Sequence, residues 1–181
     1  MSAFIDKTID AILKSEGGFV DHKSDNGKAT NFGITEAVAR ANGYQGTMRD
    51  LPVGLARSIY ERRYITEPKF DKVLEIHEAV GTELIDTGVN MGPARAAEFL
   101  QRWLNAFNAQ GSRYPDMFVD GRLGPISLDA LRKFLVWRGP LEGGSVLLKA
   151  LNSIQAMRYL EIAEANKSQE DFLYGWIRGR A

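Results

Sequence analysis

The sequence contains no cysteine and only two histidines among its 181 residues. The lack of cysteine excludes disulfides, thiolate nucleophiles and cysteine-ligated metal sites. His22 and His77 do not form a paired-histidine motif of the kind that binds zinc. We therefore expect neither a metal ion nor another cofactor.

An excess of one charge and long apolar runs are also missing. Lys and Arg total 23, as do Asp and Glu, and the arginines are scattered, so nucleic acid is not an expected partner. No apolar run approaches the ~20 residues of a transmembrane helix, so membrane insertion is not expected. Residues 1–12, which include Asp6 and Asp10, do not resemble a secretory signal. We expect cytoplasmic synthesis, and a target outside the cytoplasm would then require a separate release route.

Strand-like alternation is absent, whereas apolar residues recur at helical spacing along most of the chain. Gly17-Gly18, Gly139-Pro140 and Gly143-Gly144 are expected to interrupt the helices, and residues 108–122 to form a loop and the weakest boundary. The predicted class is all-α, with roughly eight helices and little or no sheet. The pattern predicts helices over 2–15, 36–41, 50–64, 93–107, 125–137, 146–165 and 172–177, and one or two over 74–89.

The most unusual stretch covers residues 16–35, which are polar, glycine-rich and long for a connection between helices. Glu16 follows Ile12 by four residues and Leu13 by three, so it continues the apolar stripe of the first helix. We expect this carboxyl group to be partly desolvated, which favours its protonated form.

Two further polar residues, Asp25 and Thr30, could act together with a protonated carboxylic acid at residue 16. Asp25 lies nine residues after Glu16 in a polar loop, and the Thr30 hydroxyl could hold a water or orient Asp25. Glycoside hydrolysis needs a protonated acid and a second group in a different environment. Asp25 could alternatively be only a turn residue, since Ser-Asp-Asn-Gly is a strong turn sequence, and the Thr30 hydroxyl could instead bond only to nearby backbone.

These residues resemble the catalytic spacing of phage-type lysozymes and, more closely, the signature of glycoside hydrolase family 108, which includes phage endolysins and proteins described as secretion activators. One departure is Lys28 after Gly27, where family members often have Gly-Gly. The resemblance spans nearly the whole chain. Its blocks are 16–20 with Asp25 and Gly27, 30–35, 59–64, 86–92, 100–101, 104–105, 120–125 and 172–176.

The resemblance implies a lysozyme-like fold and N-acetylmuramidase activity on the β-1,4 bonds of peptidoglycan glycan strands. It implies a catalytic part over residues 1–92 and a peptidoglycan-binding-like part over 93–181. Glu16 would be the general acid, and Asp25 and Thr30 would complete the catalytic set. A holin-like partner would fit the release of such an enzyme, which would act in the periplasm or cell wall.

Several assignments keep alternatives. Asp86 and Asn90 share a helix face and either form a cleft wall facing Glu16 or close a helix end as a buried polar pair. The three tryptophans (Trp103, Trp137 and Trp176) are expected to pack in the core rather than to stack on sugars. The function could instead be that of a lytic transglycosylase, or of a non-catalytic protein that binds peptidoglycan or activates export. The candidate substrate-binding residues are His22, Asn31, Tyr64, Asp86 and Asn90.

Overall fold

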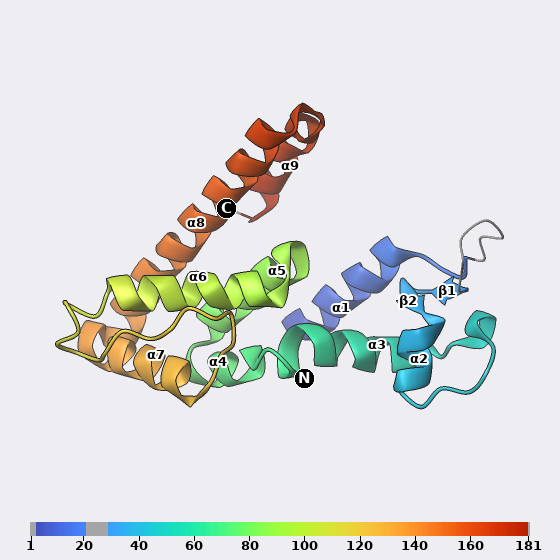
Figure 1. The fold of residues 1–181 in the computed structure, drawn as a ribbon, viewed down its shortest axis with the longest axis horizontal. Coiled ribbons are helices and arrows are strands. Elements are labelled where there is room, and N and C mark those ends of the chain that lie inside the picture. The colour runs from blue at the N-terminus through green and yellow to red at the C-terminus, as the bar shows by residue number, and fades with distance from the viewer. Residues whose placement is uncertain (1–2, 21–28, 181) are drawn as a thin grey trace. The chain divides into compact units, whose positions relative to one another are not determined.

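The computed structural model describes residues 3–20 and 29–180, which form two compact units that divide between Ile65 and Thr66 (Figure 1). Within these residues nearly all regular structure is helical, which confirms the predicted all-α class. The sheet in the described part of the chain is one short antiparallel ribbon in the first unit.

The first unit is built on helices α1 (Ala3–Glu16) and α3 (Val53–Glu61), which pack against each other through buried apolar side chains. The 50–64 segment predicted as one helix is in fact a 3-10 turn, α3 and a π-helical turn, η2 (Arg62–Thr66). The elements between α1 and α3 are β1 (Thr30–Asn31), β2 (Ile34–Thr35), α2 (Glu36–Ala41) and η1 (Met48–Asp50).

Arg57 on α3 joins the two helices by charge. Its guanidinium lies 3.0 Å from a carboxylate oxygen of Asp6 and also pairs with Asp10, both on α1. These groups are largely open to solvent, so the pairs orient the helices more than they stabilise them.

The second unit is a bundle centred on α5, which packs against α4, α6 and α8. The segment 74–89 contributes to two helices because the extended backbone of His77 (φ −156°) separates α4 from α5. In Figure 1, α9 lies alongside the end of α8, as their contacts require. The helices are α4 (Phe70–Ile76), α5 (Glu78–Met91), α6 (Pro93–Ala106), α7 (Pro125–Arg138), α8 (Gly144–Ala165) and α9 (Glu170–Arg180).

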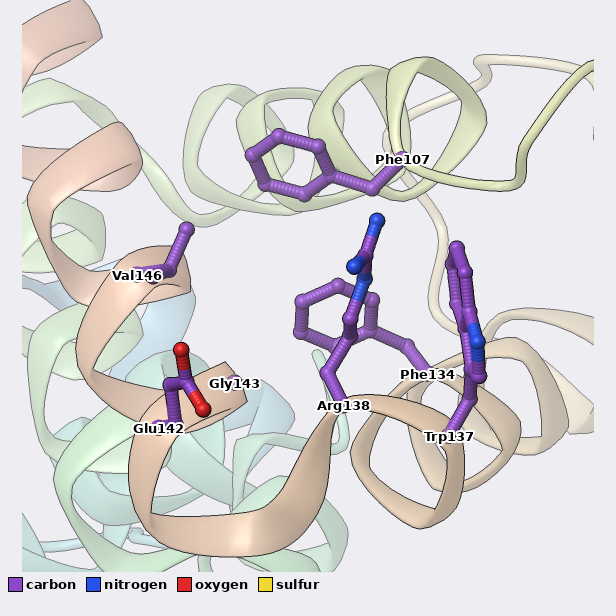
Figure 2. A pocket seen from close by; sticks show the side chains of 7 residues that line it. All are labelled: Phe107, Phe134, Trp137, Arg138, Glu142, Gly143 and Val146. Atoms are coloured by element: carbon purple, nitrogen blue, oxygen red, sulfur yellow. The ribbon is translucent and has the colours of Figure 1, made fainter.

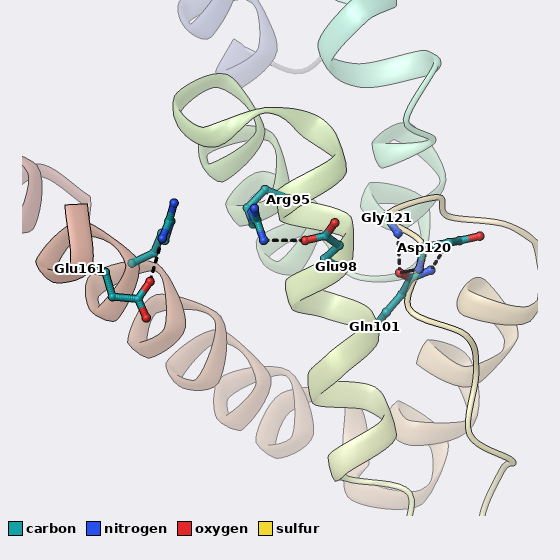
Figure 3. Close-up of polar contacts among 7 residues, drawn as sticks. Arg95, Glu98, Gln101, Asp120, Gly121 and Glu161 are labelled. Atoms are coloured by element: carbon teal, nitrogen blue, oxygen red, sulfur yellow. Dashed lines mark hydrogen bonds and ion pairs between the residues drawn. The ribbon is translucent and has the colours of Figure 1, made fainter. Parts of the chain in front are cut away.

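The segment between α6 and α7 is held by amide side chains of α6, so it does not act as a loose boundary. Gln101 is buried, and its Oε1 accepts hydrogen bonds from the backbone N–H groups of Asp120 (3.1 Å) and Gly121 (2.9 Å). Its Nε2 donates to Asp120 Oδ1 at 2.9 Å (Figure 3). One turn later, Asn105 pairs with both backbone groups of Met117.

One predicted helix interruption is wrong. Gly139 does turn the chain, with φ at +81°, but Gly143 and Gly144 have helical dihedrals and continue into α8. A Cβ on Gly144 would overlap the His77 imidazole, with Cε1 only 2.8 Å away. Glycine is required there by the close approach of another side chain rather than by a break.

The expectation that the tryptophans pack in the core holds only in part, because all three are half-buried. Trp103 stacks on Phe107, and Trp176 on α9 lies 5.1 Å from the Tyr159 ring. Trp137 lines a cavity. Each indole covers the core from its edge and leaves part of its surface accessible.

Candidate active site

Glu16 is the last residue of α1, and the structure explains why the helix ends there. Gly17 adopts a left-handed conformation (φ +76°), and its N–H still bonds the Leu13 carbonyl oxygen at 3.3 Å. Ile12 and Leu13 are buried as predicted, but Glu16 is exposed. The predicted desolvation of Glu16 is therefore wrong: the apolar stripe loses its cover at the helix end.

The β1–β2 hairpin presents a tight turn to the Glu16 carboxylate. Thr30 pairs with Thr35 and Asn31 with Ile34, which leaves Phe32 and Gly33 as the turn. Both turn residues have positive φ, +52° for Phe32 and +68° for Gly33, as a type I′ turn requires. Phe32 is not glycine, so this conformation has to be stabilised by its surroundings.

Tyr60 of α3 supplies that stabilisation. Its hydroxyl donates a 2.7 Å hydrogen bond to the Phe32 carbonyl oxygen. A Cβ on Gly33 would lie 2.9 Å from this hydroxyl, 2.8 Å from the Glu16 Cδ, and would overlap Glu16 Oε2. The absence of a side chain at Gly33 thus brings the Glu16 carboxylate and the Tyr60 hydroxyl to one point.

The Tyr60 hydroxyl stays protonated over the physiological range. Burial raises the pKa of Tyr60 to about 12, and the nearby charge of Glu16 contributes to the rise. Tyr64 stacks on Tyr60 with ring centroids 6.1 Å apart, and the Arg63 guanidinium lies over the Tyr64 ring. Tyr64, a predicted substrate-binding residue, is half-buried and so retains an accessible edge.

Thr30 and Asn31 lie on opposite faces of the ribbon. Asn31 is buried, and its amide nitrogen donates to the backbone carbonyls of Met48 (2.9 Å) and Arg49 (3.2 Å). Its side chain therefore holds η1 against the hairpin, while its predicted contact with substrate stays a prediction. Thr30 alternates to the other face, and its backbone also pairs with that of Val20.

Two predicted residues, His22 and Asp25, lie outside the described residues, so their predicted roles stay predictions. Among the residues that are described, no group of three or more His, Asp and Glu side chains is arranged to hold a metal ion.

Asp86 and Asn90 lie together near the end of α5. Asn90 Nδ2 donates to the Asp86 carbonyl oxygen (2.7 Å) and to its Oδ2 (3.3 Å), so the two form the polar pair of the second alternative, although both are half-buried rather than buried. Asn90 also lines a cavity of about 270 Å³ with Arg95, Arg158 and Trp176, among others. That the pair faces Glu16 stays a prediction.

A second carboxyl group with an unusual environment, Glu83 on α5, was missed from the sequence. Burial raises the pKa of Glu83 to about 7; a hydrogen bond from Thr87 (3.1 Å) opposes the rise, and the Asp86 charge adds to it. Thr87 in turn accepts a 2.9 Å hydrogen bond from the buried Gln155 of α8. The spacing of Glu83, Asp86 and Thr87 on one helix face was the available signal.

Comparisons with known proteins divide the chain in two. Residues 9–92 match the family described as Glycosyl hydrolase 108, and residues 95–181 match the one described as Predicted Peptidoglycan domain. A solved structure of SagA from Brucella abortus is similar over 95% of this chain and 86% of its own, with a TM-score of 0.55 and 25% sequence identity. Among curated proteins, none matches the chain. Glu16, Gly33 and Tyr60 all fall within the first match.

Proposed function

We propose that this chain, whose residues 9–92 belong to glycosyl hydrolase family 108 and whose residues 95–181 match a predicted peptidoglycan domain, is an N-acetylmuramidase. The two matches support a lysozyme-like function directed at peptidoglycan. The enzyme would hydrolyse the β-1,4 glycosidic bonds of the glycan strand. Glu16 is the proposed general acid.

The observation that carries this proposal is the setting of the Glu16 carboxylate. It is exposed at a helix end, lies against the bare backbone of Gly33, and is close to the Tyr60 hydroxyl. A general acid has to come within hydrogen-bonding distance of the leaving oxygen of a bulky sugar, so it needs an accessible carboxyl group. A bound sugar would itself exclude water from Glu16 and favour the protonated form.

Tyr60 is proposed as a positioning residue. Its hydroxyl remains protonated and donates to the Phe32 carbonyl, so it holds the strained turn on which Glu16 rests. The position of the Glu16 carboxylate relative to the substrate then depends on the hairpin as well as on α1. Small displacements of a catalytic group lower the reaction rate strongly.

Asp25 and Thr30 are proposed as the second carboxylate and its hydroxyl partner. The support for Thr30 is its place in β1, next to the Phe32-Gly33 turn that contacts the Glu16 carboxylate, on the face opposite the buried Asn31. Asp25 would stabilise positive charge at the reacting carbon or direct water. In the sequence it falls between Val20 and Thr30, whose backbones pair with each other.

The test is Glu16→Gln, assayed by release of glycan fragments from purified cell walls. The amide keeps the size of the side chain but cannot donate the required proton, so we expect release to fall by at least about 100-fold with unchanged thermal unfolding. Glu36→Gln, which removes an ion pair with Arg40 in the same unit, is the matched control. Full activity of Glu16→Gln would reject the assignment.

The products separate hydrolysis from transglycosylation. A muramidase leaves a reducing muramic acid end, whereas a lytic transglycosylase leaves an anhydro end; mass spectrometry distinguishes the two. Binding to walls that is unchanged in Glu16→Gln, together with no fragment release by the wild-type protein, would instead favour the non-catalytic alternative.

The site of action is part of the same proposal. No helix in the described part of the chain is long and apolar enough to cross a membrane. We place the enzyme at the cell wall after release through a holin-like partner, because its substrate lies there.

A further inference from the structure

The second unit contains a cavity of about 350 Å³ at the junction of α6, α7 and α8, far along the chain from Glu16 (Figure 2). Its size is in the range of small-ligand sites. The cavity lies entirely within the residues that match the predicted peptidoglycan domain. The lining residues are Phe107, Phe134, Trp137, Arg138, Glu142, Gly143 and Val146.

Aromatic rings form the apolar part of this cavity. Phe107 and Phe134 stack with centroids 5.5 Å apart and planes inclined by 15°. Phe134 is buried in the core, so it fixes the floor, while Phe107 and Trp137 are half-buried and leave ring surface accessible. The stacked neighbours hold these rings in place, and their accessible edges offer apolar contact to the C–H groups of a pyranose ring.

Two charged side chains, Arg138 and Glu142, line the cavity. The Arg138 guanidinium lies 3.7 Å from the Trp137 ring centroid, and that of Arg113 lies 4.7 Å from it. Figure 2 shows the Arg138 guanidinium between Phe107 and Trp137, with the Glu142 carboxylate on another side of the cavity. Among the described residues neither arginine forms an ion pair, so the aromatic contact orients each guanidinium and leaves its N–H groups for another acceptor.

From this arrangement we propose that the cavity binds a carboxylate-bearing sugar unit of the glycan strand. The sugar would pack its C–H groups against the accessible edges of Phe107 and Trp137, and its carboxylate would accept hydrogen bonds from Arg138, a geometry that guanidinium groups favour. Glu142 would accept from hydroxyl or amide N–H groups on the opposite side of the sugar. This inference rests on the proposed function in one respect, the identity of the target as peptidoglycan.

The test measures binding with the full chain carrying Glu16→Gln, so that the ligand is not consumed. The probes are glycan oligosaccharides stripped of peptide, whose muramic acid carboxylates are free; N-acetylglucosamine oligosaccharides of the same length; and the stem peptide alone. Titration calorimetry with each probe compares this protein with added Arg138→Met, Trp137→Leu or the control Arg132→Met. Arg132 is exposed on the same helix and does not line the cavity.

We expect Arg138→Met and Trp137→Leu each to weaken binding of the muramic acid oligosaccharide by about tenfold or more, while Arg132→Met has no effect. The oligosaccharide without carboxylates should bind more weakly, with no change in Arg138→Met. Equal affinities of all four proteins for the muramic acid probe would overturn the proposal. Tighter binding of the stem peptide alone, lost in Arg138→Met, would overturn the sugar assignment.

Failure here can be distinguished from failure of the proposed activity. Fragment release that is lost in Glu16→Gln, with binding unchanged by both cavity variants, rejects the cavity and leaves the muramidase. Fragment release that survives Glu16→Gln rejects the acid, and the calorimetry is then repeated with the muramic acid monosaccharide, which has no glycosidic bond to cleave. Thermal unfolding of each variant establishes that it is folded, and Trp137→Phe, which keeps a ring, should restore most of the affinity.

Discussion

The Tyr60 hydroxyl donates a 2.7 Å hydrogen bond to the Phe32 carbonyl oxygen, in the turn on which the Glu16 carboxylate rests. The position of the proposed acid therefore depends on two residues: Gly33, which leaves space for the Glu16 carboxylate, and Tyr60, which holds the turn in place. Both can be removed singly, and each removal has a matched control elsewhere in the first unit.

Tyr60→Phe should reduce glycan release by about tenfold and lower the free energy of unfolding by about 1 kcal/mol, because it removes one hydrogen bond and loosens the turn under Glu16. Tyr44→Phe is the control, since the Tyr44 hydroxyl also donates to a backbone carbonyl, that of Thr47, at 2.8 Å. Its stability cost should be similar and its activity unchanged. Equal loss of activity in both variants would show that Tyr60 acts only through stability.

Gly33→Ala should abolish most activity. The new methyl group would occupy the space of the Glu16 carboxylate and lie 2.9 Å from the Tyr60 hydroxyl, at a residue whose φ of +68° already disfavours alanine. Gly43→Ala separates these effects, because Gly43 also has a positive φ (+82°) but has no atom within 4 Å of the place that a methyl group would take. We expect Gly43→Ala to cost about 1–2 kcal/mol of stability and to retain full lysis of cell walls.

The sequence predicted those features that depend on local spacing. The periodicity of apolar residues predicted the helices, and Gly17 predicted the end of α1 beside Glu16. It did not reveal that Tyr60 reaches the turn at Phe32, because that contact joins residues 28 positions apart. Gly144 was wrongly predicted to be a break because its partner, His77, is distant in sequence and only packing brings the two together.

Burial explains the remaining differences. Glu16 continues an apolar stripe, yet it is exposed because the stripe has no partner at the helix end. Glu83 lies on the same helix as Asp86, but its carboxyl group is partly buried where α5 packs against α8. Thr87 of α5 links the two helices, since it donates to Glu83 and accepts from Gln155 of α8. Whether a side chain is buried depends on how the neighbouring helix packs against it, and the local spacing of apolar residues does not predict that packing.

Glu83 should make the second unit less stable as pH rises. Its pKa in the folded protein is about 7, above its ordinary value, so the folded state binds the proton more tightly than the unfolded chain. Stability from this group is therefore fully present below about pH 4.5 and is lost as pH rises to about 7. After allowance for solvent screening of this partly exposed group, the loss is about 1–2 kcal/mol.

Urea unfolding at pH 5 and pH 8 measures this effect, with Glu83→Gln as the variant. The amide cannot ionise, so Glu83→Gln should be more stable than the wild-type protein at pH 8, and the gain should shrink at pH 5. Glu161→Gln, which removes an exposed partner of Arg158 on α8, should show no such pH-dependent gain. A gain for Glu83→Gln that is the same at both pH values would contradict the assignment.

His77 and Gly144 should be strongly coupled. His77 Nδ1 accepts a 3.3 Å hydrogen bond from the Val80 N–H at the start of α5, and its Nε2 lies 3.1 Å from the Pro140 carbonyl oxygen. Because Nδ1 accepts, Nε2 carries the proton and donates to Pro140. The ring is thereby fixed against the backbone of Gly144, so Gly144→Ala should cost about 1–3 kcal/mol.

A double-mutant cycle tests this coupling by urea unfolding. His77→Ala alone loses the hydrogen bond that caps the N-terminus of α5 and the hydrogen bond to Pro140. It also removes the imidazole from the place that a methyl group on residue 144 would take. In that background Gly144→Ala should cost nothing or stabilise by up to about 1 kcal/mol, because alanine favours the helix that Gly144 begins. Gly54→Ala supplies the control: Gly54 lies within α3 with open space where the methyl group would lie, so this change should stabilise the protein in either background. Additive costs for His77→Ala and Gly144→Ala would mean that helix geometry, not the imidazole, requires glycine at residue 144.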